Sequence, residues 1–129
     1  MYSSLDISIL IHATENEDRV LKSVLEFIEQ PIESVKIDSV KTEGHWKNPI
    51  LRFRVFVNMD VDKIFDKLNS NLVKSYGETD IKNYIEHDTD KKGCFYVRLD
   101  KQKFCSGKII LSDKDSVRMV FKKIAKFKL

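Results

Sequence analysis

The sequence has few of the residues that fix small proteins covalently or interrupt their regular structure. Its 129 residues include two cysteines, two prolines and four glycines. These counts exclude a disulfide-rich scaffold, a collagen-like fibre and a low-complexity chain. Cys94 and Cys105 also lack metal-ligand spacing, so we expect free thiols that are buried or half-buried. A cross-strand disulfide between them stays open as the alternative.

Long hydrophobic runs are absent as well. No stretch approaches the ~20 apolar residues that span a bilayer. The N-terminus lacks the basic region and the small-residue cleavage site of a signal peptide. We therefore expect a cytoplasmic protein with no membrane partner. The length predicts a single domain, residues 1–129, whose one core buries roughly two-thirds of the surface of the unfolded chain.

The motifs of common enzymes are missing too. There is no Gly-rich phosphate loop, no His-x-x-x-His or Cys-x-x-Cys pair and no Gly-x-Ser-x-Gly elbow, so the usual nucleotide, metal and hydrolase signatures are lacking. We expect no catalysis, no cofactor and no metal. His12, His45 and His87 lie far apart in the sequence, and we interpret His12 as structural. A nuclease that uses the histidines is kept as the third hypothesis for function.

Charge is distributed unevenly along the chain. Residues 1–90 hold 11 Lys or Arg and 17 Asp or Glu, whereas residues 91–129 hold 12 Lys or Arg and 3 Asp or Glu. The C-terminal third therefore carries a net charge of +9 in a chain of net charge +3. Such a segment is typical of a polyanion-binding surface, provided that its charges share one face. A solvated face balanced by the acidic part is the alternative.

Hydrophobic periodicity predicts both strands and helices. The expected strands cover residues 5–11, 35–40, 50–57, 94–99 and 109–111, and the expected helices cover residues 15–29, 61–76 and 81–85. Thr14 and Glu17 form a candidate capping box for the first helix, and Asp60 is a candidate N-cap for the second. Residues 116–129 fit both a helix and a strand.

The order of these elements allows too few parallel crossovers for a doubly wound sheet. We therefore predict an α+β fold with a mostly antiparallel sheet and the two main helices packed on one face of it. The other face, or the loops along its edge, then stays available for a partner.

The only tryptophan, Trp46, lies between two turn signals in the stretch EGHWKNPI. Two interpretations stay open. Trp46 either covers one end of the core, or it forms an exposed stacking platform beside His45, Lys47 and Asn48. An aromatic ring beside a cation and an amide is the combination that single-stranded RNA sites use.

The C-terminal third interleaves aromatic and basic residues. Basic side chains attract phosphates, and aromatic side chains stack on bases. Arg98, Lys101 and Gln102 crowd into a stretch that we expect to be a loop or a strand end, which favours them as contacts. The full set of candidates here is Tyr96, Arg98, Lys101, Gln102, Lys103, Lys108 and Lys122. A strand pair with a buried aromatic face and a lysine-rich solvent face has the same pattern and stays open as the alternative.

Three stretches, IHATENEDRVLKSV, EGHWKNPI and FYVRLDKQKFCSGKIIL, occur in this order in the chain. Together they resemble an archaeal family of small predicted RNA-binding proteins and predicted exosome subunits, over roughly residues 5–127. The resemblance implies a ribosomal-protein-L5-like α+β fold and favours a strand for the last segment. It also implies that two groups carry the function, namely Gly44, His45, Asn48 and Pro49 in the loop, and Arg98, Asp100, Lys101 and Gln102 further on.

Residues and resemblance together lead to one main hypothesis, a non-enzymatic RNA-binding accessory protein. Its partner is single-stranded or structured RNA, and the resemblance adds exosome or ribosome components. The predicted contacts are His45, Trp46, Lys47, Asn48, Tyr96, Arg98, Lys101, Gln102, Lys103, Lys108 and Lys122. The alternative is a protein-interaction adaptor whose basic C-terminal third docks an acidic partner subunit.

Overall fold

The structure, a computed structural model, describes residues 2–43 and 49–123. Its strands are β1 (Ser4–His12), β2 (Lys36–Glu43), β3 (Pro49–Val57), β4 (Phe95–Asp100) and β5 (Ser116–Lys122). Its helices are α1 (Glu17–Ile28), α2 (Val61–Tyr76), α3 (Glu78–His87) and the short α4 (Lys101–Cys105), with a single 3-10 turn, η1, at Ile32–Ser34. The predicted α+β class is confirmed.

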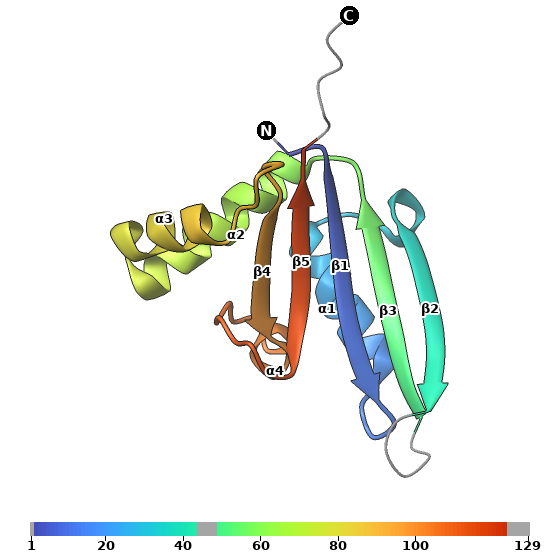
Figure 1. Cartoon of the computed structure of the whole chain (residues 1–129). Helices are drawn as coiled ribbons and strands as arrows, with labels where there is room; N and C mark the ends of the chain where they lie inside the picture. Colours follow the sequence, from blue (N-terminus) through green and yellow to red (C-terminus); the bar gives the residue numbers. More distant parts are fainter. Residues whose placement is uncertain (1, 44–48, 124–129) are drawn as a thin grey trace, which may run out of the picture.

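The strands form one sheet in the order β2-β3-β1-β5-β4, and every neighbouring pair is antiparallel. Figure 1 shows α1 and α2 against one face of this sheet, with α3 projecting beyond β4. No helix of the described chain covers the opposite face. The predicted arrangement, with both main helices on one face of an antiparallel sheet, is therefore confirmed.

The core lies between the sheet and the helices. In β1, alternate residues point toward the helices, and Leu5, Ile7, Ile9 and Ile11 are at most 3% exposed. The helices contribute apolar stripes at helical spacing, namely Val20, Val24, Phe27 and Ile28 from α1 and Val61, Ile64, Leu68 and Leu72 from α2. Burying one such side chain stabilises the fold by roughly 1.5–3 kcal/mol, so these stripes fix which face of the sheet stays open.

The ambiguous C-terminal segment forms strand β5. Val117, Met119 and Phe121 alternate into the core, and β5 pairs with β1 on one side and with β4 on the other. Because this segment has a strand partner on each side, it follows the alternating strand pattern and not the helical one. The strand predicted at 109–111 is wrong, because only Leu111 forms a bridge, to Leu99, and Ile109 packs into the core.

The predicted helix caps need correction. α1 begins at Glu17, and its N-cap is Asn16, whose side chain accepts a hydrogen bond from the Arg19 N–H at 3.2 Å. The Thr14–Glu17 capping box is therefore wrong. Asp60 does precede α2, but its backbone is left-handed, with φ of 54°, and its side chain makes no capping hydrogen bond in the structure described. Asp tolerates this conformation better than most residues do.

Two expectations from composition concern the whole chain. Cys94 and Cys105 are free, half-buried thiols, as predicted. Among residues 2–43 and 49–123, no helix has the length and apolar character that crossing a membrane requires.

Candidate nucleic-acid interface

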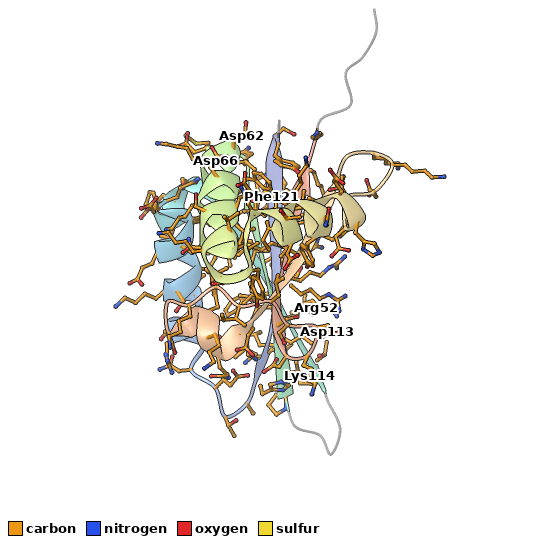
Figure 2. All side chains as sticks on the ribbon, turned by 90° about the vertical axis from the view of Figure 1, so that its left-hand side faces the viewer. Arg52, Asp62, Asp66, Asp113, Lys114 and Phe121 are labelled. Atoms are coloured by element: carbon orange, nitrogen blue, oxygen red, sulfur yellow. The ribbon has the colours of Figure 1, made fainter. Side chains whose placement is uncertain are left out.

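The open face of the sheet gathers most of the arginines of the chain. Of the 23 Lys and Arg residues, five are arginine. Four of these five, Arg52, Arg54, Arg98 and Arg118, occupy strand positions that point away from α1 and α2, and all four are exposed. Figure 2 shows Arg52 on this side of the molecule, away from Asp62 and Asp66 of α2. We call the surface formed by these four residues the arginine face.

The pairing register places three of these side chains in one row. Arg54 lies opposite Ser8, Ser8 lies opposite Arg118, and Arg118 lies opposite Arg98. Directly opposite residues in antiparallel strands point to the same face, with Cβ atoms ≈ 4.5–5.5 Å apart. The row therefore crosses β3, β1, β5 and β4, with the small side chain of Ser8 inside it. Arg52 lies next to this row, opposite Leu10.

Asp38 of β2 lies opposite Arg54 in the sheet, but no acidic side chain of the described chain forms a salt bridge with any of the four arginines. Every salt bridge within residues 2–43 and 49–123 involves a lysine or a histidine. Like charges directly opposite each other, as Arg98 and Arg118 are, destabilise a strand pair by roughly 0.2–1 kcal/mol. A planar guanidinium matches a phosphate with two parallel hydrogen bonds. The arginine face thus offers guanidinium groups that no salt bridge of the described chain occupies, and only Arg54 has a carboxylate opposite it in the sheet.

An exposed aromatic ring lies beside these cations. Tyr96 of β4 is 38% exposed, and the Arg118 guanidinium lies 5.9 Å from the centroid of its ring. The Tyr96 hydroxyl donates a hydrogen bond of 3.0 Å to Asp90 Oδ2, which fixes the ring. This hydrogen bond and the negative charge of Asp90 raise the pKa of Tyr96. A fixed, exposed ring of this kind is suited to stacking on a nucleobase.

Two hollows mark the surface around the arginine face. The first, of about 570 Å³, is bordered by Ser8, Arg52 and Arg54 and by Lys114 of the loop before β5. The second, of about 610 Å³, lies toward α3 and the loop at 111–113. Arg98 and Arg118 line both hollows. Both volumes fall in the range of ligand pockets, so the surface has relief as well as charge.

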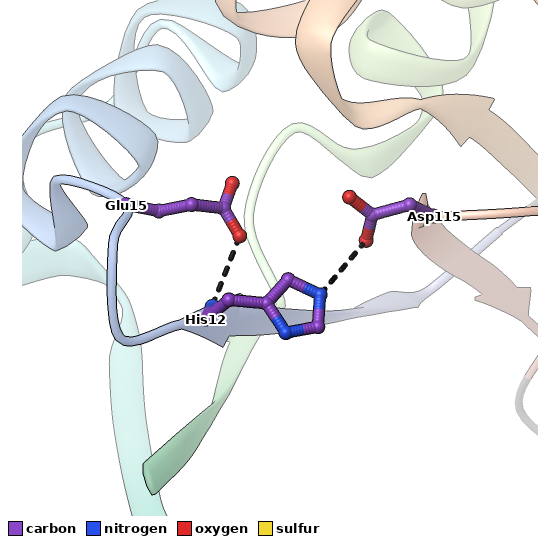
Figure 3. A group of neighbouring side chains, drawn as sticks. All are labelled: His12, Glu15 and Asp115. Carbon is purple, nitrogen blue, oxygen red and sulfur yellow. Dashed lines mark hydrogen bonds and ion pairs between the residues drawn. The ribbon is translucent and has the colours of Figure 1, made fainter. Parts of the chain in front are cut away.

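A second group of charges lies at the end of β1, and we call it the Lys101 cluster: Lys101, His12, Glu15 and Asp115. Lys101 is fully buried. Its ammonium donates to Glu15 Oε1 at 2.6 Å, to the Leu10 carbonyl at 2.8 Å, and lies 3.0 Å from Asp115 Oδ1. The His12 Nε2 atom lies 3.8 Å from Asp115 Oδ1, and the backbone N–H of His12 donates to Glu15 Oε1 (Figure 3).

The chemistry of the Lys101 cluster is that of an internal ion pair. Burial by itself raises the pKa of Glu15, but the hydrogen bonds from Lys101 and from the His12 N–H, with the charge of Lys101, outweigh it and lower that pKa. The ligand atoms of His12, Glu15 and Asp115 lie within 4.8 Å of one another, close enough for a metal ion. Both carboxylates are already paired with the Lys101 ammonium, however, so a metal ion would have to displace that ammonium.

The structure changes the role of Lys101. Residues 101–105 form α4 instead of the expected loop or strand end, because Asp100 Oδ1 accepts a hydrogen bond from the Lys103 N–H at 2.8 Å and caps a helix there. The buried Lys101 ammonium is held by protein groups on three sides and does not reach the surface. We therefore do not keep it among the proposed RNA contacts.

The other predicted contacts are dispersed. Tyr96 and Arg98 lie on the open face, and Lys122 lies at its upper end, paired with Asp6 at 2.6 Å. Gln102 is exposed and donates to Glu15. Lys103 and Lys108 are exposed in and after α4, a helix whose Phe104 packs on Phe27 of α1 on the helix-covered side of the sheet. His45, Trp46, Lys47 and Asn48 lie outside the described residues.

The sequence contained a signal for the three residues of the arginine face that the prediction missed. Arg52 and Arg54 alternate with the buried residues of β3, and Arg118 does the same in β5. All three were available from strand alternation and from the scarcity of arginine relative to lysine. The sequence did not show which strands are neighbours, and the strand order is what brings them together.

Comparisons with known proteins identify the family of this chain. The family model described as RNA binding matches residues 4–123. An uncharacterized protein, MJ0213, from Methanocaldococcus jannaschii is 37% identical over 130 residues, covering 94% of this chain and 84% of the relative. The RNA-binding protein PAB1135 from Pyrococcus abyssi is 29% identical over 128 residues, covering 96% of this chain and 82% of the relative.

Solved structures share the fold. Mth689, a DUF54 protein from Methanothermobacter thermautotrophicus, superposes with a TM-score of 0.77 at 22% identity, covering 98% of this chain and 88% of that one. SSO0741 from Sulfolobus solfataricus, also assigned to DUF54, gives a TM-score of 0.73 at 18% identity, with 93% and 87% covered. At these identities the likeness establishes the fold alone, and all four proteins come from archaea.

Proposed function

This chain belongs to the family described as RNA binding, and from this premise we propose that it binds RNA through the arginine face. One observation carries the proposal: four exposed arginines share one face of the sheet, and none of them forms a salt bridge within the described chain. Phosphates would relieve the repulsion between Arg98 and Arg118, which the protein leaves uncompensated.

The proposed binding mode has two parts. Arg52, Arg54, Arg98 and Arg118 hold successive phosphates, and this attraction does not depend on sequence. Tyr96 offers a ring for one base. The stretch 43–50, with His45, Trp46, Lys47 and Asn48, stays a proposed further contact because it combines an aromatic residue with a cation and an amide.

We propose that the protein acts by binding alone, as an accessory in RNA processing, degradation or ribosome metabolism. Within residues 2–43 and 49–123, the only cluster of three or more metal-ligating side chains is His12, Glu15 and Asp115, and the Lys101 ammonium is paired with both of its carboxylates. The proposal that exosome or ribosome components are partners rests on the family resemblance of the three sequence stretches.

A salt-dependent titration tests the proposal. Fluorescence anisotropy of a labelled RNA of about ten nucleotides is measured between about 50 and 200 mM salt for the wild type, Arg54→Gln and Arg118→Gln. We expect affinity to fall steeply with salt, and each substitution to weaken binding and to reduce the slope of log K against log salt by about 0.7. Arg19→Gln is the matched control, because Arg19 is the one arginine outside the arginine face and lies on α1.

The outcomes separate the candidate functions. If Arg19→Gln and Arg118→Gln lowered RNA affinity equally, the arginine face would not be the RNA-binding surface. No RNA binding, together with a protein partner that co-purifies from the source cell and resists nuclease, would favour the adaptor. Cleavage of the RNA, lost in His12→Ala, would overturn the proposal of binding alone.

A further inference from the structure

The hollow between β4 and the loop at 111–113 combines two arginines of the arginine face with side chains that are not among the proposed phosphate contacts. It is lined by Tyr84, Tyr96, Leu111 and Asp113, and by Arg98 and Arg118, which it shares with the rest of the arginine face. We call it the β4 hollow. Its volume of about 610 Å³ is enough for a nucleobase with its ribose.

The walls of the β4 hollow are suited to a flat ring. Tyr96 is fixed by Asp90 on one side and by Arg118 on the other, so little side-chain freedom is lost when it stacks. Burial, with the charge and hydrogen bonding of Asp88, raises the pKa of Tyr84 to about 12, so this phenol stays neutral. Leu111 adds an apolar surface. The lining therefore accepts the π-face of a base.

Charges of both signs face the β4 hollow without pairing with each other. Arg98 and Arg118 supply donors, and Asp113 supplies acceptors, yet no salt bridge joins them in the described chain. Asp88 also lines the hollow, but its Oδ1 atom is already hydrogen-bonded to His87 Nδ1 at 2.8 Å. Asp113 is exposed and makes no side-chain hydrogen bond with the residues described. Its carboxylate is the free acceptor of the hollow.

A ligand that satisfies this lining needs acceptors on one edge and donors on another. Guanine has both: O6 and N7 accept from arginine, and the Watson–Crick edge donates through N1–H and the N2 amino group. Uracil lacks an amino group, and adenine lacks an acceptor at position 6. We propose that the β4 hollow binds one unpaired guanine of the RNA. Arg98 or Arg118 then binds its O6 and N7 in place of a phosphate, Asp113 binds its N1–H and N2, and Tyr96 stacks on its ring. This inference rests on the proposed function.

The test compares single-stranded RNAs that differ in one base. The probes are labelled oligouridines of about ten nucleotides whose central base is uracil, guanine, adenine or cytosine. We expect the guanine probe to bind about tenfold more tightly than the other three. The preference should disappear in Asp113→Ala and in Tyr96→Ala. Asp66→Ala, which removes the same charge from an exposed position on α2 (Figure 2), should keep it.

Each outcome decides between two levels of the proposal. If no probe binds the wild type, RNA binding itself fails. If all four probes bind equally, or if the adenine or cytosine probe binds most tightly, RNA binding stands and the guanine site is overturned. A guanine preference that survives in Asp113→Ala would exclude that carboxylate as the reader of the base. Guanosine monophosphate that binds as tightly as the guanine probe would show that the hollow serves a free nucleotide instead of RNA.

Discussion

Positive charge is buried and paired in the Lys101 cluster, whereas on the arginine face it is exposed and forms no salt bridge within the described chain. Lys101 is buried, and two carboxylates and a backbone carbonyl hold its ammonium. The four arginines are exposed, and two of them lie directly opposite each other. A paired, buried cation serves the stability of the fold, whereas unpaired cations on one face cost stability and stay available to a ligand. Net charge along the sequence does not distinguish the two.

Replacing Lys101 should produce the largest change in stability. Lys101→Met leaves Glu15 and Asp115 without their cation, and breaking a buried pair by removing one partner is strongly destabilising. Because Asp115 is 46% exposed, we expect a loss of about 2 kcal/mol in the free energy of unfolding, below the usual range for fully buried pairs. Urea unfolding measures it.

Lys103→Met is the matched control for this substitution, since Lys103 lies on the same helix and is exposed. Its effect should stay within about 0.5 kcal/mol. RNA affinity of the folded Lys101→Met protein should be close to that of the wild type. Equal stability of the two variants would mean that the Lys101 cluster does not stabilise the fold.

An intermediate effect is expected from acid. The folded state lowers the pKa of Glu15 below its ordinary value of 4.5, so its stabilisation is complete above that value and is lost as pH falls through the lowered pKa. Glu15→Gln should therefore flatten the fall in unfolding free energy below about pH 5. Glu17→Gln, at an exposed position in the first turn of α1, should not. If the unfolding free energy of Glu15→Gln fell with acid as steeply as that of the wild type, the Glu15 carboxylate would not be a source of this pH dependence.

The smallest expected effect has the opposite sign. Arg98→Gln removes the repulsion from Arg118, so the free energy of unfolding should rise by up to about 1 kcal/mol at low salt. The gain should shrink as salt screens the charges, while RNA affinity falls. Thermal melts at two salt concentrations, with Arg19→Gln beside them, measure this. A loss of stability in Arg98→Gln would show that the arginine contributes to the fold and would weaken the contrast drawn above.

Local patterns predicted the elements well and the surfaces poorly. Alternation located β1, β3 and β4, and helical spacing located α1, α2 and α3, because each pattern depends on which side of one element is buried. Even the facing of Arg52 and Arg54 to one side of their strand follows from the sequence. Their meeting with Arg118 depends on β1 pairing with both β3 and β5, and no local pattern encodes that pairing.

The errors have related causes. Lys101 resembled its neighbours as a surface cation, and its burial depends on Glu15, which lies 86 positions earlier in the chain. The strand predicted at 109–111 failed because an apolar run does not reveal whether a full ladder partner exists. The excess charge of the C-terminal third pointed to Lys103 and Lys108, which lie away from the open face, and their contact with RNA stays a prediction. Whether Trp46 covers the core or stacks on a base stays a prediction.

The outer edge of β4 is closed by the same segments that border the hollow. As an outer strand, β4 would present free backbone groups on which another chain could add a strand. The Tyr96 N–H instead donates to the Asp88 carbonyl, the Asp100 N–H donates to the Ile110 carbonyl, and the Arg98 carbonyl accepts from the Ser112 N–H. The two segments that seal this edge also border the β4 hollow. A substitution that disrupts either segment would therefore open the edge of β4 and remove a wall of the hollow at the same time.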